Sequence, residues 1–250
     1  MGHRITPATT QSPRREEPAA RSEVDLGRRG FIGASVTGCA AGLATGAGAL
    51  LLRPTPARAQ TIASPNAALQ EMMAGNRRYV EGAMTSFNED LAILKEKTVE
   101  KQEPYAAVLS CADSRVPVEI IFDQSIGHVF VARVAGNIAS SELIASLEYG
   151  VAVLGTKAIM VLGHSNCGAV KATIDAKAVP GQISALYPYI RPAVDQAGPN
   201  LDAAIKANAK IQAGLLRQAS PVIAEAVKAN KLKVVAAQYD LASGKVSLLD

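Results

Sequence analysis

Two short segments of this chain carry most of its potential for chemistry. The segment "CADSRV" begins at Cys111 and places a carboxylate and a guanidinium, Asp113 and Arg115, on the next alternate positions. The segment "GHSNCGA" contains an imidazole and a second thiol three residues apart, His164 and Cys167. The two thiols could form a disulfide, or the thiols and the imidazole together could bind a metal ion. The rest of the sequence helps to distinguish these alternatives.

The three side chains Cys111, His164 and Cys167 are of the types that zinc prefers as ligands. Three protein ligands leave the fourth tetrahedral position open, which is typical of a catalytic rather than a structural zinc site. Zinc lowers the pKa of a bound water from about 15.7 towards about 7 and so supplies hydroxide at neutral pH. The sequence therefore predicts one catalytic zinc ion per chain, with a disulfide between the two cysteines as the alternative.

The carboxylate of Asp113 follows a predicted zinc ligand by two residues. It can therefore bind the fourth zinc position in a closed state, or accept a hydrogen bond from hydroxide there. Arg115 can hold this carboxylate with two hydrogen bonds and keep it ionised. We interpret Asp113 and Arg115 as a catalytic pair. The alternative interpretation is an ordinary ion pair that caps the following helix.

Short apolar segments alternate with predicted helices from Pro104 onward. The predicted strands are 105–110, 128–134, 157–163, 232–240 and 245–249. The predicted helices cover about 140–154, 167–178, 201–216 and 220–230. This alternation indicates an α/β fold, with a mostly parallel sheet of four to five strands covered by helices on both faces. Functional groups of such sheets gather at the carboxyl ends of the strands, so the two motifs meet if their strands are neighbours.

The first 59 residues resemble a targeting segment. The letters "RRGF", which begin at Arg28, resemble a twin-arginine export signal. Residues 30–52 are uncharged and rich in Gly and Ala, and the letters "ARA" that end at Ala59 fit the small-x-small cleavage rule. We therefore expect residues 1–59 to be a signal peptide that engages the twin-arginine translocase during export.

Cleavage between Ala59 and Gln60 would release a periplasmic or secreted mature chain. A transmembrane anchor is the main alternative, because 23 uncharged residues can span a bilayer. A weaker alternative is lipid attachment at Cys39, which ends the letters "VTGC". Export of an already folded protein would protect both remaining thiols if zinc is loaded beforehand in the reducing cytoplasm.

Two further regions follow the predicted signal peptide. Residues 60–103 are predicted to be an N-terminal helical arm, whose first helix begins after Ser64 as N-cap and Pro65 at its first position. Residues 104–250 are predicted to be the zinc-binding α/β catalytic domain. The formal charge of +4 suggests an anionic partner, but the eight Arg and four acidic residues of the predicted signal account for all of it. Nucleic acid is therefore not expected as a partner.

The segments "CADSRV", "RVAGN" and "GHSNCGA" together resemble the β-class carbonic anhydrases. The resemblance implies zinc on Cys111, His164 and Cys167, and catalysis by Asp113 and Arg115. It also implies reversible hydration of carbon dioxide to bicarbonate and a proton by zinc-bound hydroxide. An obligate homodimer or a dimer of dimers is implied as well, with the sites near the subunit interface.

Further positions resemble the plant-like branch of that family. The resemblance implies that Gln102 donates to a substrate oxygen, and that Phe130 and Tyr149 line the carbon dioxide pocket, one of them from the neighbouring subunit. Spacing alone would leave Gln102 solvated and the two aromatic residues in an ordinary core. The other branch has a regulatory tryptophan where this chain has Val108, so a bicarbonate-stabilised inactive state is not expected. We interpret His128 as an exposed residue at a strand start, with proton relay as the alternative.

Three rival functions remain open. The first is a carbon disulfide or carbonyl sulfide hydrolase on the same fold, because these substrates are isoelectronic with carbon dioxide. The second is a thiol–disulfide protein, although the chain has no C-x-x-C segment. The third is a non-catalytic zinc-binding module, and the intact pair of Asp113 and Arg115 argues against it.

Overall fold

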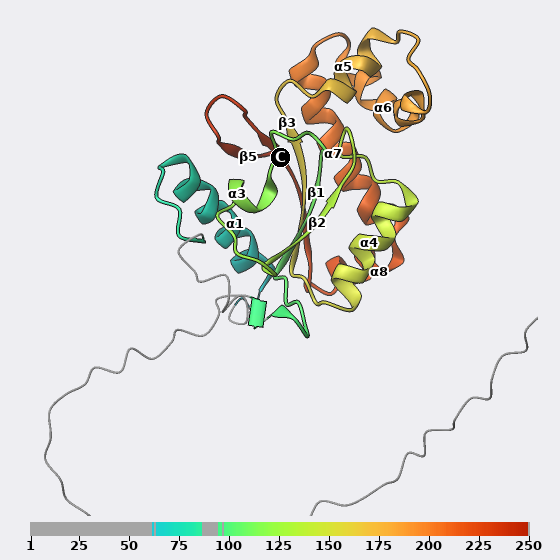
Figure 1. The fold of residues 1–250 in the computed structure, drawn as a ribbon. Coiled ribbons are helices and arrows are strands. Elements are labelled where there is room, and N and C mark those ends of the chain that lie inside the picture. The colour runs from blue at the N-terminus through green and yellow to red at the C-terminus, as the bar shows by residue number, and fades with distance from the viewer. Residues whose placement is uncertain (1–61, 63, 87–94, 97, 250) are drawn as a thin grey trace, which may run out of the picture. The chain divides into compact units, whose positions relative to one another are not determined.

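A sheet with the strand order β2-β1-β3-β4-β5 organises the described part of this computed structural model (Figure 1). The structure describes residues 62, 64–86, 95–96 and 98–249, so the predicted signal peptide lies outside the described residues. The strands are β1 (Ala106–Ser110), β2 (Val129–Arg133), β3 (Ala158–His164), β4 (Lys233–Tyr239) and β5 (Val246–Leu249). The pairs β1–β2, β1–β3 and β3–β4 are parallel, and β5 pairs antiparallel with β4. The predicted mostly parallel α/β fold is confirmed.

The helices of the described residues include two that the sequence did not predict. They are α1 (Pro65–Val80), α3 (Val118–Ile121), α4 (Ser141–Ala152), α5 (Gly168–Asp175), α6 (Tyr187–Ala197), α7 (Leu201–Ala219) and α8 (Pro221–Lys228), with a 3₁₀ turn at Ile183–Leu186. Neither α3 nor α6 was predicted. The sequence of α6 contains Pro188 in its first turn and Pro192 in its interior, where a proline removes a backbone hydrogen bond.

One face of the sheet is covered by α1 and α3. The first helix begins as predicted, because the Ser64 side chain accepts a hydrogen bond from the backbone N–H of Ala67. Its buried Ala68 and Met72 pack in one apolar cluster with alternate strand residues such as Met160. The N-terminal arm therefore contributes part of the core. Residues 87–94 and 97 of the predicted arm lie outside the described residues.

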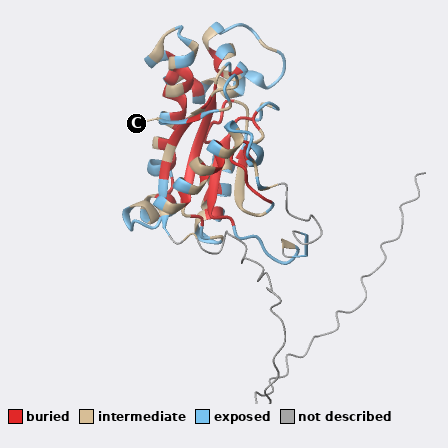
Figure 2. Ribbon diagram, turned by 90° about the vertical axis from the view of Figure 1, so that its left-hand side faces the viewer, coloured by how far each residue is buried: buried red, intermediate tan, exposed pale blue. Residues whose placement is uncertain are grey.

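The opposite face of the sheet is covered by α4, α7 and α8. Side chains of the other strand parity, such as Leu109, Ile159 and Val161, pack there against helix residues including Leu147 and Leu216. Figure 2 shows the strands buried between the helices. The central strands β1 and β3 are buried along their whole length, which is why their sequences are almost continuously apolar.

The edge of the sheet at the carboxyl ends of β1 and β3 carries both motifs. Parallel pairing places Ser110 beside Leu162, so the residues that follow β1 lie next to the end of β3. The strand register therefore brings together segments that are about 50 residues apart in sequence. None of the helices within the described residues is long and apolar enough to cross a membrane.

Candidate metal centre

Three predicted ligands meet at this edge of the sheet. Cys111 directly follows β1, His164 ends β3, and Cys167 is the N-cap residue of α5. Their two sulfur atoms and a ring nitrogen all lie within 4.8 Å of one another, and all three residues are buried. Both thiols are free rather than joined in a disulfide.

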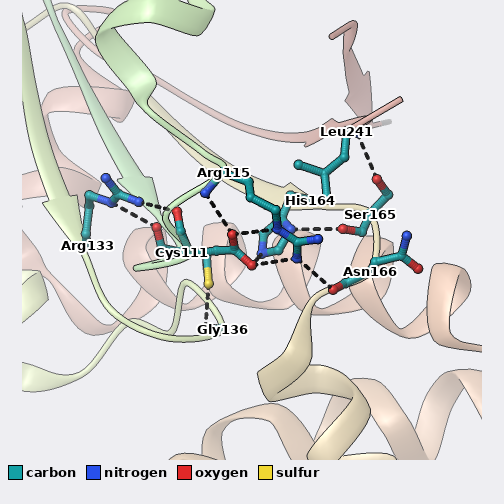
Figure 3. Close-up of polar contacts among 9 residues, drawn as sticks. Cys111, Arg115, Arg133, Gly136, His164, Ser165, Asn166 and Leu241 are labelled. Carbon is teal, nitrogen blue, oxygen red and sulfur yellow. Dashed lines mark hydrogen bonds and ion pairs between the residues drawn. The ribbon is translucent and has the colours of Figure 1, made fainter. Parts of the chain in front are cut away.

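The donor atoms of this cluster fit zinc. His164 Nδ1 lies 2.9 Å from the carbonyl oxygen of Ser165 and can donate its proton to it, as Figure 3 shows. That contact leaves the lone pair on Nε2, which is buried and has no hydrogen-bond partner among the described residues. A buried acceptor nitrogen beside two thiols is the donor set of a zinc ion with two sulfur ligands and one nitrogen ligand.

The two thiols influence each other strongly. The hydrogen bond from Cys167, opposed by burial and supported by the backbone N–H of Gly136, lowers the pKa of the Cys111 thiol. The hydrogen bond to Cys111, together with burial and the nearby negative charge, raises the pKa of the Cys167 thiol. Two thiolates this close repel each other in an apolar setting, so a divalent cation is the partner that allows both to ionise.

Asp113 and Arg115 form the ion pair that the sequence suggested. Arg115 donates from Nε to Asp113 Oδ1 at 3.0 Å and from Nη2 to Oδ2 at 2.8 Å. The backbone N–H of Arg115 also donates to Oδ1 at 2.9 Å. The hydrogen bond from the Arg115 side chain outweighs burial and holds the pKa of Asp113 well below its usual range. Asp113 Oδ2 lies 3.8 Å from His164 Nε2, so a permanent negative charge lies beside the ligand atoms.

Two contacts to Cys111 were not predicted from the sequence. Arg133, at the end of β2, donates to the carbonyl oxygens of Cys111 at 2.9 Å and Asp113 at 2.6 Å (Figure 3). The backbone N–H of Gly136 donates to the Cys111 sulfur at 3.3 Å. Both residues belong to "RVAGN", so that segment was a signal, but the sequence did not indicate what its residues contact.

The predicted substrate-binding residues lie apart from the ligands within one chain. Gln102 is exposed and precedes β1, whose opposite end leads to Cys111. Phe130 pairs with Ala107, near the start of β1. Tyr149 projects from α4 with its ring centroid 6.4 Å from that of Phe130. The structure thus brings the two aromatic residues together, but towards the far end of β1.

His128 also lies away from the ligands. It precedes β2 and is half-buried rather than exposed, and its carbonyl oxygen accepts from the backbone N–H of Tyr105. Its side chain lines a separate pocket together with Arg78 and Asp123. His128 therefore stands at the strand start as predicted, but the prediction that it is exposed is wrong, because the residue lines this pocket.

Comparison with known proteins identifies the family. The carbonic anhydrase family model matches residues 106–246. A carbonic anhydrase of Mycolicibacterium smegmatis is 33% identical over 196 residues, which is 74% of this chain and 93% of that protein. The chain therefore belongs to the carbonic anhydrase family.

Similar solved structures indicate which class of carbonic anhydrase the chain belongs to. A β-carbonic anhydrase of Coccomyxa, in complex with acetazolamide, has a TM-score of 0.57 and 28% identity over 72% of this chain and 86% of that one. The structure of a tetrameric β-carbonic anhydrase of Sordaria macrospora matches this chain with a TM-score of 0.58 and 25% sequence identity. The match covers 64% of this chain and 87% of that one. The protein is a zinc-dependent lyase of the β class that acts on carbon dioxide.

Proposed function

We propose that the chain hydrates carbon dioxide to bicarbonate at a zinc ion held by Cys111, His164 and Cys167. Asp113 and Arg115 form the catalytic pair. The observation that carries this assignment is the approach of three ligand atoms to within 4.8 Å, beside an ionised carboxylate. Family membership supports the reaction, and this geometry supports the choice of residues.

The protein residues control what can approach the metal. Zinc supplies acidity, because it lowers the pKa of a water molecule so that hydroxide is available near neutral pH. Asp113 is kept ionised by Arg115 and offers only acceptor oxygens, so it orients a nucleophile that carries a proton. The same negative charge disfavours other anions at that position. The two hydrogen bonds from Arg115 would also compete with binding of this carboxylate to a metal ion held by the three ligands.

The substrate pocket is proposed to need a second copy of the chain. Gln102, Phe130 and Tyr149 lie towards the far end of β1, so one chain does not bring them to its own metal centre. We assign them to substrate binding in a homodimer or a dimer of dimers, where a copy supplies what its partner's site lacks. The tetrameric assembly of the Sordaria proteins supports an oligomer.

The chain is proposed to belong to the plant-like branch. Val108, at the position of the regulatory tryptophan of the other branch, is fully buried in the core beneath α1 and α3. A small apolar side chain there provides no aromatic platform or donor for bicarbonate. Added bicarbonate should therefore cause only ordinary product inhibition, without a steep cooperative loss of activity.

Export through the twin-arginine translocase is proposed from residues 1–59 alone. The paired arginines, the uncharged Gly/Ala-rich segment and the cleavage pattern before Gln60 support it. The mature protein would then work in the periplasm or outside the cell.

The function is tested by measuring zinc content and gas turnover on the same preparation. We expect one zinc per chain, with carbon dioxide hydration that is lost on chelation and restored by added zinc. Carbon disulfide and carbonyl sulfide serve as competing substrates. Faster hydrolysis of either gas than hydration of carbon dioxide would show that the reaction is wrongly assigned. Zinc-free protein with a reversible Cys111–Cys167 disulfide would instead favour thiol chemistry.

A further inference from the structure

Two amide side chains, Asn208 and Gln212, are buried on the inner face of α7. Each is only 1% exposed, and they lie one helical turn apart among buried Ala, Ile and Leu residues. An unpaired amide in such a place would cost free energy, so its partners explain why it can be there. Those partners are backbone groups of α6 and of the loop that follows β2.

The contacts of these amides form one network. Asn208 Nδ2 donates to the carbonyl oxygen of Gly136 at 2.8 Å. Gln212 Oε1 accepts from the backbone N–H of Ala139 at 2.9 Å. Gln212 Nε2 donates to the carbonyl oxygen of Tyr189 at 3.0 Å and to Asn208 Oδ1 at 3.1 Å. Backbone carbonyls only accept and backbone N–H groups only donate. These partners therefore determine which end of each side-chain amide is the oxygen and which is the nitrogen.

The loop held by this network contacts the metal centre through Gly136. Its backbone N–H donates to the Cys111 sulfur at 3.3 Å, as Figure 3 shows. Gly136 has a φ of +78°, and a Cβ there would lie 2.7 Å from Ile190 Cδ1. The loop therefore approaches the sulfur in a left-handed backbone conformation that favours glycine.

A hydrogen bond to a ligand sulfur alters how that sulfur binds a metal. The N–H withdraws electron density from the thiolate, and the effect is strong where water is excluded. Cys111 is 4% exposed and lies in an apolar cluster with Ile138 and Ile190. Two thiolate ligands would otherwise reduce the acidity of the metal. In a metal-loaded site, the hydrogen bond from Gly136 to the Cys111 sulfur would offset part of that reduction.

We infer that Asn208 and Gln212 are positioning residues for the metal centre, holding the Gly136 N–H against the Cys111 sulfur. The inference rests on the proposed metal site. It predicts that changes in α7, on residues that do not touch the metal ligands, alter the electronic state of the Cys111 thiolate.

The variant Asn208→Asp tests this role. An aspartate keeps the acceptor for Gln212 but replaces the donor to Gly136 with an acceptor. The matched control is Asn76→Asp. Asn76, on α1, is 3% exposed and donates to the backbone carbonyls of Ile121 and Gly244, while its Oδ1 accepts from the backbone N–H of Val246. Both substitutions therefore place a carboxylate opposite backbone carbonyls in the core, and only Asn208→Asp does so at the loop that contacts Cys111.

The readout is the sulfur-to-metal charge-transfer band of the cobalt-substituted protein. Loss of the Gly136 hydrogen bond makes the sulfur richer in electrons, so the band should move to longer wavelength in Asn208→Asp and stay in place in Asn76→Asp. The kcat/KM of the zinc form should fall about 10- to 100-fold in Asn208→Asp only, as for other groups that orient metal ligands. An unshifted band in a folded, metal-loaded Asn208→Asp protein would overturn the inference.

A second measurement needs no variant and covers the case in which Asn208→Asp does not fold. In wild-type protein loaded with an NMR-active cadmium isotope, the Gly136 amide proton should couple to the metal across the hydrogen bond to Cys111. The absence of this coupling, in protein whose other ligand couplings to cadmium are seen, would also overturn the inference. Failure of the protein to bind any metal would contradict the proposed function instead.

Discussion

At the scale of single residues, the ion pair of Asp113 and Arg115 sets the charge beside the metal-binding atoms. The pKa of Asp113 is held well below its usual range by the Arg115 side chain. The carboxylate therefore stays ionised throughout the neutral pH range. A change of activity between pH 6 and 9 would not arise from Asp113. A zinc ion in the site would supply the titrating group by lowering the pKa of a water molecule.

Replacing Asp113 with asparagine should separate metal binding from turnover. Asp113→Asn keeps the size of the side chain but removes the negative charge and one acceptor oxygen. We expect zinc content to stay at one per chain and kcat/KM for carbon dioxide to fall at least about 10-fold. Asp202→Asn, which changes an exposed carboxylate paired with Lys206, is the control and should keep parental activity. Parental activity in Asp113→Asn would mean that the pair only stabilises the loop.

The clustering of the three proposed ligands could be predicted from the sequence, because their residue types and spacing are specific. Cys111, His164 and Cys167 follow predicted strands, and those strands proved to be neighbours. The contacts of Arg133 and Asn208 could not be predicted in the same way. Both side chains donate to backbone carbonyl oxygens of other segments. Every residue has such an oxygen, so the sequence does not indicate which one is contacted.

At the scale of elements, Asp123 ties the end of α1 to the segment after α3. It accepts from Arg78 Nε at 2.5 Å and from the backbone N–H groups of Thr85 at 2.9 Å and Ser86 at 2.8 Å. Burial alone would raise the pKa of Asp123, but the hydrogen bonds from Arg78 and Ser86 outweigh it and lower the pKa to about 2. The folded state therefore favours the ionised carboxylate.

Acid should remove this contribution to stability. The folded-state pKa lies below the unfolded value of about 3.9, so the contribution is complete above about pH 4 and is lost as pH falls towards 2. We expect Asp123→Asn to lower the free energy of unfolding by about 2 kcal/mol at pH 7. Urea titrations should show the difference from wild type shrinking between pH 4 and 2. A difference that is the same at both ends of this range would contradict the assignment.

The elements themselves followed the sequence closely, and the exceptions have physical reasons. The five predicted strands agree with β1 to β5 to within about one residue at each end. The helix α6 was missed because Pro188 and Pro192 argue against a helix on local grounds. Packing of its buried Ile190 and Val194 outweighs that local preference.

At the scale of the whole molecule, one chain brings together the proposed metal ligands but leaves the proposed substrate-binding residues apart from them. The distance of Gln102, Phe130 and Tyr149 from the ligands was not evident from the sequence, because it depends on which end of β1 each residue lies near. We expect light scattering to find dimers or tetramers, and dilution that yields monomers to abolish turnover. Fully active monomers would contradict the assignment of these residues.

Export can be tested on the full-length precursor. Replacing Arg28 and Arg29 with lysines should leave precursor in the cytoplasm, while the unaltered precursor should give a mature chain that begins at Gln60. The N-terminal sequence of the exported protein is the measurement. A start upstream of Leu52, or at Cys39 with lipid attached, would support a membrane anchor instead.

The variant Cys167→Ser tests the central claim most directly, with the unaltered chain as its reference. We expect Cys167→Ser to lose zinc and carbon dioxide hydration together, because a serine hydroxyl is not a thiolate ligand. Zinc content per chain is measured on the folded protein beside its hydration rate. Stoichiometric zinc and parental hydration in Cys167→Ser would contradict the claim that Cys111, His164 and Cys167 hold the catalytic metal.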